Sequence, residues 1–499
     1  MSLFSWEVIS PLLQPSTILL MVIGCIIGLF IGALPALGDN IAIALLLPIT
    51  LSLDPVVGIA MLMCIYQASE YGGSISSITL GIPGQGGAVC TMFDGVPMAR
   101  RGEPGRALAI SLTSSTVGGF FGVAALMFLT VSLMPLIYKL TDPEITCITA
   151  FGLLSIVCLN TQSGTKSLLS ILLGLLVCTI GVDPFSGEPR FTFGAHVLDD
   201  GFSLVPVIIG LYAIPRIIES LVDKQEREQL IVDKSQLKFN FKKGDFRNCL
   251  PVMLLGSTIG TLTSLIPGLG TGPTTVFTYN ICKSMKKHKD TFGTGDPRGI
   301  ACVEAANNAC VGGHLIPYLT MGIAGSGSIA LIGGALVMHG IAPGATLMKN
   351  NPELVYGVMW GVLCSVILMF LFGIFSTRIF ARIMNIPDTL MAPLLIFFSF
   401  AGSYVTRYMS IDIWICLGIG IAAYFAIKAG YSQTNFVVAF VLAKVFENSL
   451  RRSLYISHGD WSIFLTRKVC LVFVILMVGF VVLSVVRGIR SRRAIEESI

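Results

Sequence analysis

Long apolar segments are the feature that most restricts how this chain can fold. A membrane-spanning helix needs about 20 predominantly apolar residues, and continuous candidates cover residues 17–34, 106–136, 145–159, 168–182, 202–221, 354–378, 411–427, 436–446 and 469–486. Only 12% of the 499 residues are charged, whereas soluble proteins carry about 25%. The sequence therefore predicts an all-α polytopic membrane protein. It excludes an ordinary cytosolic enzyme, a secreted disulfide scaffold and a disordered chain.

The basic residues are clustered, and the clusters predict the orientation of the chain. Lys and Arg are concentrated in residues 100–106, 224–247 and 487–493, and short basic loops stay on the cytoplasmic side of a membrane. We expect these three segments inside the cell, whereas segment 283–289 cannot be assigned to a side in this way. No Lys or Arg precedes Arg100, which argues against a cleavable signal peptide. Because each cluster flanks an apolar segment, we expect no nucleic-acid binding.

The 13 cysteines do not follow a metal-binding or redox pattern. No two of them have Cys-x-x-Cys spacing, and several, such as Cys25 and Cys64, lie inside apolar runs. A buried cysteine behaves as a small apolar residue. We therefore expect no metal centre and no cofactor.

The two halves of the chain resemble each other around their glycines and prolines. Segment 24–38 reads GCIIGLFIGALPALG, and segment 256–270, displaced by 232 positions, reads GSTIGTLTSLIPGLG. Further on, residues 72–73 match residues 312–313, and LGIPG at 80–84 matches MGIAG at 321–325. The sequence therefore predicts two homologous repeats. We expect them to be inverted, although sequence identity alone does not decide between parallel and inverted repeats.

The repeats define the expected domain organisation. Residues 1–222 form the first transmembrane repeat, and residues 223–247 form a polar cytoplasmic loop. Residues 248–466 form the second transmembrane repeat, and residues 467–499 form a C-terminal transmembrane helix with a basic cytoplasmic tail.

Gly and Pro interrupt each repeat twice, first at Pro35 and Pro267 and then at residues 71–84 and 307–328, which include the Gly-Gly pairs 72–73 and 312–313. These interruptions predict a binding site. Broken backbone is tolerated in a bilayer only where protein or a wet cavity covers it. A freed helix N-terminus suits an anion, and freed carbonyl groups suit a cation such as sodium. The candidate substrate- and ion-binding residues are Pro35, Gly38, Asp39, Asn40, Gly72, Gly73, Ser74, Ser76, Pro83, Gly84, Pro267, Gly268, Gly270, Thr274, Asn307, Asn308, Gly312, Gly313, Gly325, Ser326 and Ser328.

Two other interpretations accompany this prediction. A pair of glycines at four-residue spacing, such as Gly24 and Gly28, is better explained by close packing of membrane helices. Ionisable residues within apolar segments are costly and usually functional, and they include Asp39, Glu70, Asp94, Glu304 and His314.

The positions of these ionisable residues predict different roles for them. Glu70 is either a protonatable coupling group or a carboxylate satisfied by a partner at a helix end. Asp94 lies close to the basic cluster at 100–106, so we expect a structural pairing at the membrane edge. His314 follows Gly312 and Gly313, and a lone histidine in this setting is more often a hydrogen-bonded structural residue than a titrating one.

A set of motifs across the chain resembles the large membrane subunit of the tripartite tricarboxylate transporters, the TctA family. The motifs are GALPALGDNIAIALLLPIT, EYGGSISSITLGIPG, FDGVPMARRGEPGRALAI, SLIPGLGTGP, FGTGDPRGIACVEAANNACVGGHLIPYLTMGIAGSGS, HGIAPGATL and ENSLRRSLYISHGD. The chain departs from the usual family pattern at Ala36 and Ala324, and Glu70 stands where the family tends to have a neutral amide.

The resemblance implies a bacterial inner-membrane secondary transporter with about twelve transmembrane helices. It implies a small four-span membrane partner and a periplasmic solute-binding protein. The implied substrates are citrate-like di- and tricarboxylates, taken up with Na⁺ or H⁺ and without any other cofactor.

Other functions remain open at this point. The nearest alternative is a related carrier for another small solute delivered by its own binding protein, and a passive channel is a further one. An intramembrane aspartyl protease is more remote, because its chemistry needs two carboxylates in one site and no second aspartate follows a tyrosine in an apolar segment. We therefore expect a carrier and not an enzyme.

Overall fold

Helices make up almost all of the structure, a computed structural model that describes residues 3–34, 37–137, 139–159, 164–183, 185–222, 237–266, 269–285, 290–383 and 388–496. The α-helices of the first half are α1 (Trp6–Ile9), α2 (Pro15–Ala33), α3 (Gly38–Leu46), α4 (Pro55–Thr79), α5 (Thr91–Arg100), α6 (Pro104–Ile137), α7 (Asp142–Leu159), α8 (Gly164–Cys178) and α9 (Leu204–Val222). Those of the second half are α10 (Asp245–Ser264), α11 (Thr271–Ser284), α12 (Pro297–Met321), α13 (Gly327–Met338), α14 (Ala345–Asn350), α15 (Pro352–Ile383), α16 (Asp388–Val405), α17 (Ser410–Lys428), α18 (Gln433–Ile456), α19 (Ile463–Thr466) and α20 (Lys468–Glu496).

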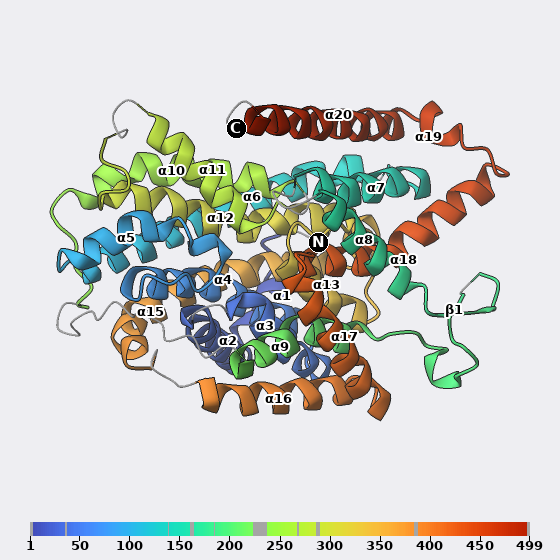
Figure 1. Ribbon diagram of the computed structural model, residues 1–499, viewed down its shortest axis with the longest axis horizontal. Helices are drawn as coiled ribbons and strands as arrows, with labels where there is room; N and C mark the ends of the chain where they lie inside the picture. The colour runs from blue at the N-terminus through green and yellow to red at the C-terminus, as the bar shows by residue number, and fades with distance from the viewer. Residues whose placement is uncertain are drawn as a thin grey trace.

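Short elements complete the described chain. The 3₁₀ helices are η1 (Ser10–Leu13), η2 (Leu47–Ser52), η3 (Gly86–Ala88) and η4 (His196–Leu198). Strands β1 (Gly181–Val182) and β2 (Pro189–Arg190) form an antiparallel hairpin in which Gly181 pairs with Arg190. The loop that carries this hairpin projects from the helical body (Figure 1).

Helices α4 and α12 form the centre of the molecule and begin in the same way. An aspartate caps each N-terminus and a proline follows it: Asp54 accepts the Val56 N–H at 2.9 Å, and Asp296 accepts the Arg298 N–H at 2.9 Å. Proline is favoured in a first helical turn because its missing N–H has no intrahelical partner there. Beyond the first turn nearly every residue of both helices is buried, so both are enclosed on all sides.

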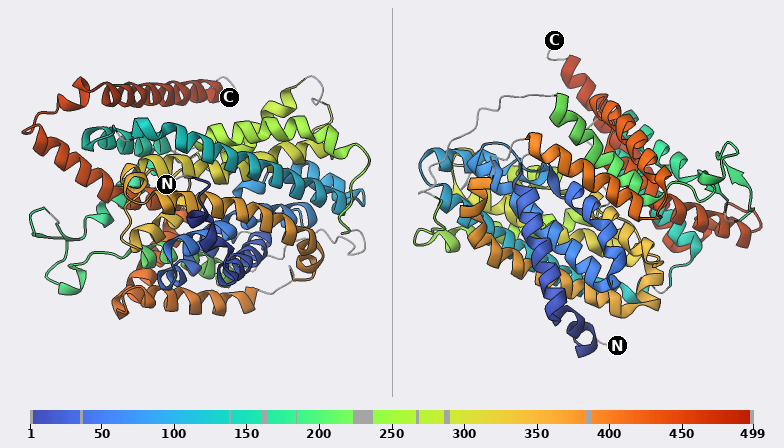
Figure 2. Two further views of the ribbon diagram at one scale, coloured as in Figure 1. Left: turned by 180° about the vertical axis from the view of Figure 1, so that it is seen from behind. Right: turned by 90° about the horizontal axis from the view of Figure 1, so that it is seen from below.

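Helices from both halves enclose this centre reciprocally. α2 packs on α4 and α10 packs on α12, each within its own half, whereas α6 packs on α12 and α15 packs on α4, each across the halves. α3 and α5 also pack on α4, and α11 packs on α12, whereas a second group of helices lies outside this centre, in which α17 packs on α9 and α18 packs on α7 and α8. α20 runs beside α7 along one edge of the molecule, and α16 runs along the opposite edge (Figures 1 and 2).

Glycines allow the close contact between α2 and α4. A Cβ on Gly28 would lie 2.4 Å from the Ile65 carbonyl oxygen, and one on Gly24 would lie 2.7 Å from that of Met61. α10 and α12 repeat the arrangement, because a Cβ on Gly260 would lie 2.3 Å from the Ala306 carbonyl oxygen. The prediction that Gly24 and Gly28 serve helix packing is confirmed.

The expected membrane segments are helical. Each of the nine apolar segments is covered largely by one helix. In segment 168–182 the helix ends at Cys178, and the last two residues belong to β1. Within the described residues, four helices are long and apolar enough to cross a membrane: Pro15–Ala33, Pro104–Leu133, Pro352–Phe375 and Ser410–Lys428. The structure thus agrees with an all-α membrane protein, and the number of about twelve spans stays a prediction.

One expected feature of the backbone is wrong. We expected interruptions at residues 72–73 and 312–313, but these glycines lie inside the continuous helices α4 and α12. A Cβ on Gly72 would lie 2.8 Å from the Leu29 carbonyl oxygen of α2, and one on Gly312 would lie 2.6 Å from Gly122 of α6. These glycines therefore serve helix packing, and the interruptions follow at residues 80–90 and 322–326.

We predict that Gly28→Ala destabilises the protein. The added methyl group would overlap backbone atoms of α4, and overpacking of this kind costs about 1–3 kcal/mol. Thermal unfolding of the purified protein measures the loss. Gly418→Ala on α17 is the control because nothing lies within 4 Å of its added Cβ, and equal unfolding temperatures of the two variants would contradict the prediction.

Candidate functional site

The first interruption of each half is present and is built on a glycine. α2 ends at Ala33 and α3 begins at Gly38, whereas α10 ends at Ser264 and α11 begins at Thr271. Gly38 has φ +69° and Gly270 has φ +65°, a left-handed conformation that glycine adopts at no steric cost. Gly38 and Gly270, which are matched between the two halves, thus share a positive φ. Pro35, Pro267 and Gly268 lie outside the described residues.

The interruptions meet across the two halves. The start of α3 lies against the start of α13, and the start of α11 lies against η3 in the loop after α4. The first interruption of each half therefore meets the second interruption of the other half. We call these two places the α3–α13 crossing and the α11–η3 crossing.

The α3–α13 crossing joins polar side chains of both halves. The Ser328 hydroxyl donates to the Asp39 carboxylate and lies 3.0 Å from Asn40 Oδ1. Ser326 caps α13 by accepting the Ile329 N–H at 3.3 Å. Since Asp39 is only 7% exposed, this crossing places a carboxylate inside the protein beside hydroxyl and amide groups.

Tyr66 of α4 extends the α3–α13 crossing toward the centre. Its hydroxyl lies 3.3 Å from Ser326 Oγ and 3.3 Å from His314 Nδ1. A Cβ on Gly325 would lie 2.7 Å from the His314 ring, so the loop lies directly on the histidine. His314 is thus hydrogen-bonded through Nδ1, whereas its Nε2 has no partner within the described structure, so the structural role expected for it stays a prediction.

The α11–η3 crossing repeats the pattern with different side chains. Gln85 donates from Nε2 to the Glu70 carboxylate. A Cβ on Gly87 would lie 2.1 Å from Asn307 Oδ1, and one on Gly272 would lie 3.4 Å from the Gly86 carbonyl oxygen. Two backbones therefore approach closely beside a second buried carboxylate, which is 2% exposed.

Side-chain amides join α4 and α12 between the two crossings. Asn308 Nδ2 donates to the Gln67 carbonyl oxygen at 3.1 Å, and Asn307 Nδ2 donates to the Glu70 carbonyl oxygen at 3.3 Å. All four residues are buried. The crossings thus lie at either side of one polar contact in the middle of the enclosed helix pair.

Several buried polar atoms around this contact lack a hydrogen-bond partner within the described structure. They are both side-chain polar atoms of Gln67, Asn307 Oδ1, Asn308 Oδ1, Gln85 Oε1 and His314 Nε2. A buried polar atom without a partner costs about 1–3 kcal/mol. The four amide oxygens can coordinate a cation, and Gln67 Nε2 can donate to a carboxylate, so a ligand that brings both kinds of group would satisfy these atoms.

Glu304 forms a third polar cluster between α12, α5 and α6. Its carboxylate accepts from the Thr91 hydroxyl and from Ser115 Oγ at 3.0 Å. Nearby, Ser74 Oγ and Ser111 Oγ are 2.6 Å apart. All of these side chains are fully buried, and no Lys, Arg or His within the residues described lies in ion-pair distance of Glu304, Glu70 or Asp39.

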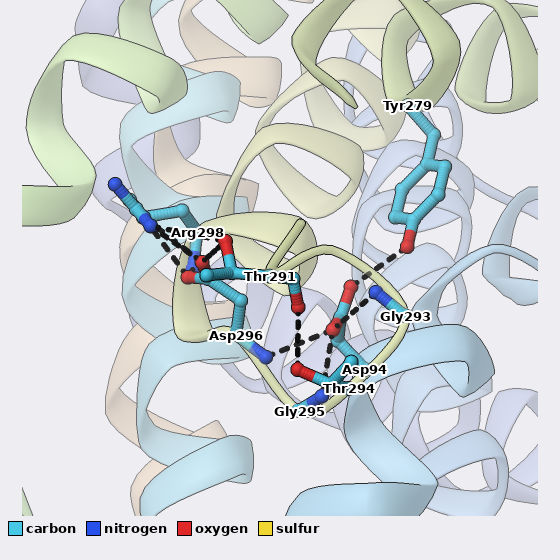
Figure 3. Close-up of polar contacts among 8 residues, drawn as sticks. All are labelled: Asp94, Tyr279, Thr291, Gly293, Thr294, Gly295, Asp296 and Arg298. Carbon is cyan, nitrogen blue, oxygen red and sulfur yellow. Dashed lines mark hydrogen bonds and ion pairs between the residues drawn. The ribbon is translucent and has the colours of Figure 1, made fainter. Parts of the chain in front are cut away.

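Asp94 has a structural role, as expected, but its partners differ from those expected. Its carboxylate accepts the backbone N–H groups of Gly293, Gly295 and Asp296 at 2.8–2.9 Å, and the Tyr279 hydroxyl at 2.9 Å. Figure 3 shows the loop folded around this carboxylate. The expected pairing with the basic cluster is wrong: the carboxylate accepts from four neutral donors, and among the described residues no Lys or Arg lies in ion-pair distance of it.

Several expected site residues make local hydrogen bonds instead. Ser74 donates to the Tyr71 carbonyl oxygen at 2.8 Å, Ser76 to that of Gly73 at 3.2 Å, and Thr274 to that of Gly270 at 2.8 Å. Pro83 is half-buried in the loop after α4. A Cβ on the neighbouring Gly84 would lie 2.2 Å from the Gly32 carbonyl oxygen, so this turn packs on α2.

Other residues of the crossings were missed from the sequence. Tyr66, Gln67 and Gln85 bring the hydrogen-bonding capacity described above, and Thr91 and Ser115 contact Glu304. Gln67 was detectable as a large amide in the otherwise apolar first part of α4. Thr91 and Ser115 carried no such signal, because hydroxyl groups are common in membrane helices.

We predict that Asp94→Asn loosens the loop at residues 291–298. The amide group would place donor hydrogens against donors, and a hydrogen bond to a charged group contributes about 1.5–3 kcal/mol. Hydrogen exchange of the Gly293, Gly295 and Asp296 amides should become faster. Asp290→Asn, at an exposed position of the same loop, should leave exchange unchanged, and equal protection in both variants would contradict the prediction.

Comparison with known proteins identifies the family of this chain. The profile of the "Tripartite tricarboxylate transporter TctA family" matches residues 18–438. The "Uncharacterized 52.8 kDa protein in TAR-I ttuC' 3'region" of Agrobacterium vitis is 32% identical over 485 residues, which cover 96% of this chain and 95% of the relative. The "Uncharacterized protein in TAR-II ttuC' 3'region" of the same organism is 30% identical over 234 residues, 47% of this chain and 97% of the relative.

No solved structure matches the chain. The family match and the first relative each extend over most of its length. The chain therefore belongs to the tripartite tricarboxylate transporter TctA family.

Proposed function

We propose that this chain is the permease subunit of a binding-protein-dependent secondary transporter in the bacterial inner membrane. It imports a citrate-like di- or tricarboxylate together with Na⁺ or H⁺. Its partners are a small four-span membrane subunit and a periplasmic solute-binding protein. The proposal includes no enzymatic activity.

The observation that carries the proposal is the reciprocal meeting of the interruptions. Each crossing combines the start of a short helix, a loop from the other half and a buried carboxylate. Partner-free amide atoms lie between the crossings. Transporters bind their solutes where interrupted helices of two repeats meet, and amide and hydroxyl donors suit the oxygens of an organic acid.

Buried carboxylates support coupling to a cation. Asp39, Glu70 and Glu304 are buried beside neutral hydroxyl and amide groups. An unpaired charge in a membrane interior is costly, so each carboxylate is expected to hold a proton or a metal cation. A solute anion can approach Glu70 only when that charge is neutralised, which would link solute binding to ion binding.

Contacts between helix ends support an inverted arrangement of the repeats. Arg106 at the start of α6 pairs with Asp245 at the start of α10 at 2.7 Å, and Arg101 donates to the Thr294 carbonyl group beyond α11. α10 and α11 would therefore enter and leave on the basic, cytoplasmic side. Asn307 of α12 contacts Glu70 of α4, whereas His314, later in α12, contacts Tyr66, earlier in α4. The two helices therefore run antiparallel, and α4 would begin on the side opposite to the start of α12.

The alternatives differ in how well the geometry supports them. A carrier for another small anion would use the same crossings, so only substrate assays separate it from the main proposal. An aspartyl protease gains no support, because the hydrogen bond that Asp39 accepts comes from Ser328 and not from a second carboxyl group.

We predict that Ser328→Ala weakens solute uptake. The full chain, reconstituted with its membrane partner and binding protein, should accumulate labelled citrate under an imposed Na⁺ or H⁺ gradient. Loss of a hydrogen bond to a charged group should raise KM about 10- to 100-fold. Ser284→Ala, at the exposed end of α11, should transport normally. Uptake that persists without any gradient would favour a channel, and equal KM values of the two variants would exclude a role for this crossing.

We predict that Glu304→Gln uncouples transport. The neutral amide mimics a protonated or cation-bound carboxylate: its oxygen can accept from one of the Thr91 and Ser115 hydroxyl groups, and its NH2 group can donate to the other. Gradient-driven accumulation should be lost, whereas exchange of labelled for unlabelled solute should continue. Glu353→Gln at an exposed position of α15 is the matched control. Normal accumulation by the Glu304 variant would assign coupling to Glu70, which Glu70→Gln tests in the same assay.

A further inference from the structure

A second polar region lies away from the crossings, where α10, α12 and the start of α6 come together. It is a cavity of about 830 Å³ with four arginines in its wall: Arg101, Arg106, Arg247 and Arg298. Asp245 and Asp296 also line it. We call it the arginine cavity.

Two of the four arginines are neutralised by the aspartates. Arg106 Nη2 lies 2.7 Å from Asp245 Oδ1, and Arg298 Nη2 lies 2.6 Å from Asp296 Oδ2. Burial acts to raise the pKa of Asp296, but hydrogen bonds from Arg298 and Thr291 outweigh it and hold the pKa below its usual value. Asp296 is therefore charged at neutral pH and balances Arg298. Asp245 and Glu103 together balance Arg106 and Lys242.

The other two arginines keep their positive charge. Arg101 donates to the Thr294 carbonyl group, which is neutral. Arg247 is exposed, and no carboxylate within the described part of the chain lies in ion-pair distance of it. Within the described residues, the cavity thus carries two guanidinium groups that have no carboxylate partner.

The wall of the cavity is firmly held. Thr294, Gly295 and Asp296 belong to the loop that folds around Asp94 (Figure 3) and also line the cavity. A Cβ on Gly295 would lie 3.1 Å from the Arg101 guanidinium group. Arg101, which follows α5, donates to the Thr294 carbonyl group of this loop, and Arg298 in the first turn of α12 bonds Asp296 at its end. These contacts orient both side chains, which lowers the entropy lost when they bind an anion.

The cavity also borders an apolar surface. Pro251 and Leu255 of α10 line it together with Met285, which is 44% exposed. On α10, Phe246 is 48% exposed and Leu254 is 45% exposed. A free anion needs only the guanidinium groups, whereas an amphiphile would use both the charged cavity and the apolar face.

We propose that the arginine cavity binds the phosphate headgroup of an anionic phospholipid, whose acyl chains follow the exposed face of α10. Guanidinium groups bind phosphate oxygens through paired hydrogen bonds. Basic pockets beside membrane helices on the cytoplasmic side bind acidic lipid headgroups. The lipid would fasten α10, the start of α6 and the loop around Asp94 to one another.

Titration of the full chain in detergent with phosphatidylglycerol tests the proposal, with thermal stability and lipid retention in native mass spectrometry as readouts. Phosphatidylglycerol should raise the unfolding temperature, whereas phosphatidylcholine and inorganic phosphate should not. The double variant Arg101→Gln/Arg247→Gln should need about 10- to 30-fold more phosphatidylglycerol for half the effect. Arg452→Gln, 61% exposed in its side chain and far along the chain on α18, should respond as the unmodified protein does.

A second variant separates lost charge from lost folding. Arg101→Lys/Arg247→Lys keeps both charges, so it should recover most of the lipid affinity that the Gln variant loses. Equal half-effect concentrations for the Gln variant and the unmodified protein would overturn the proposal, as would an equal response to phosphatidylcholine. Stabilisation by inorganic phosphate alone would overturn the lipid assignment and identify a site for soluble anions.

Discussion

Close backbone contact between glycine-bearing helices and the central pair is the constraint on which the rest of the structure depends. Gly28 and Gly260 bring α2 and α10 against the carbonyl groups of α4 and α12, and Gly118 brings α6 onto α12, where a Cβ would lie 2.1 Å from the Ala305 carbonyl oxygen. Helices at this separation leave no path for lipid. Polar side chains in α4 and α12 can therefore exist at membrane depth, because protein rather than hydrocarbon surrounds them.

Part of this arrangement follows from the sequence in physical terms. The glycine pairs identify helix contacts because only small residues allow such an approach, and the matched Gly38 and Gly270 identify interruptions because both adopt positive φ. The Gly-Gly pairs at 72–73 and 312–313 were wrongly predicted to interrupt their helices. A glycine pair is compatible with a break and with tight packing, and in a membrane the packed helix satisfies its own backbone. The position of the neighbouring helix decides whether a glycine pair marks a break or a packing contact, and the local sequence does not specify that position.

The candidate site was predictable in position but not in pairing. Asp39 and Ser328 were both identifiable next to interruptions, yet their contact joins the first interruption of one half to the second of the other. A repeat in sequence says which segments are alike and not which segments touch. Gln85 shows a second limit, since an amide in a glycine-rich loop resembles any surface residue until the loop is found folded over Glu70.

The number of hydrogen-bond donors separates structural carboxylates from those suited to transport. Asp94 accepts four hydrogen bonds from neutral donors, three at Oδ1 and one at Oδ2. Its charge is thereby distributed over fixed neutral donors, and nothing further needs to bind. Glu304 accepts from the hydroxyl groups of Thr91, Ser115 and Ser111, and Glu70 accepts from the side-chain amides of Gln85 and Asn307, so both accept fewer hydrogen bonds than Asp94. A proton or a cation can bind these two carboxylates and leave again, whereas the donors around Asp94 could be displaced only by unfolding the loop. A buried carboxylate therefore stabilises a loop at the edge of the molecule, as Asp94 does. At the centre, Glu70 and Glu304 can instead bind and release a proton or a cation.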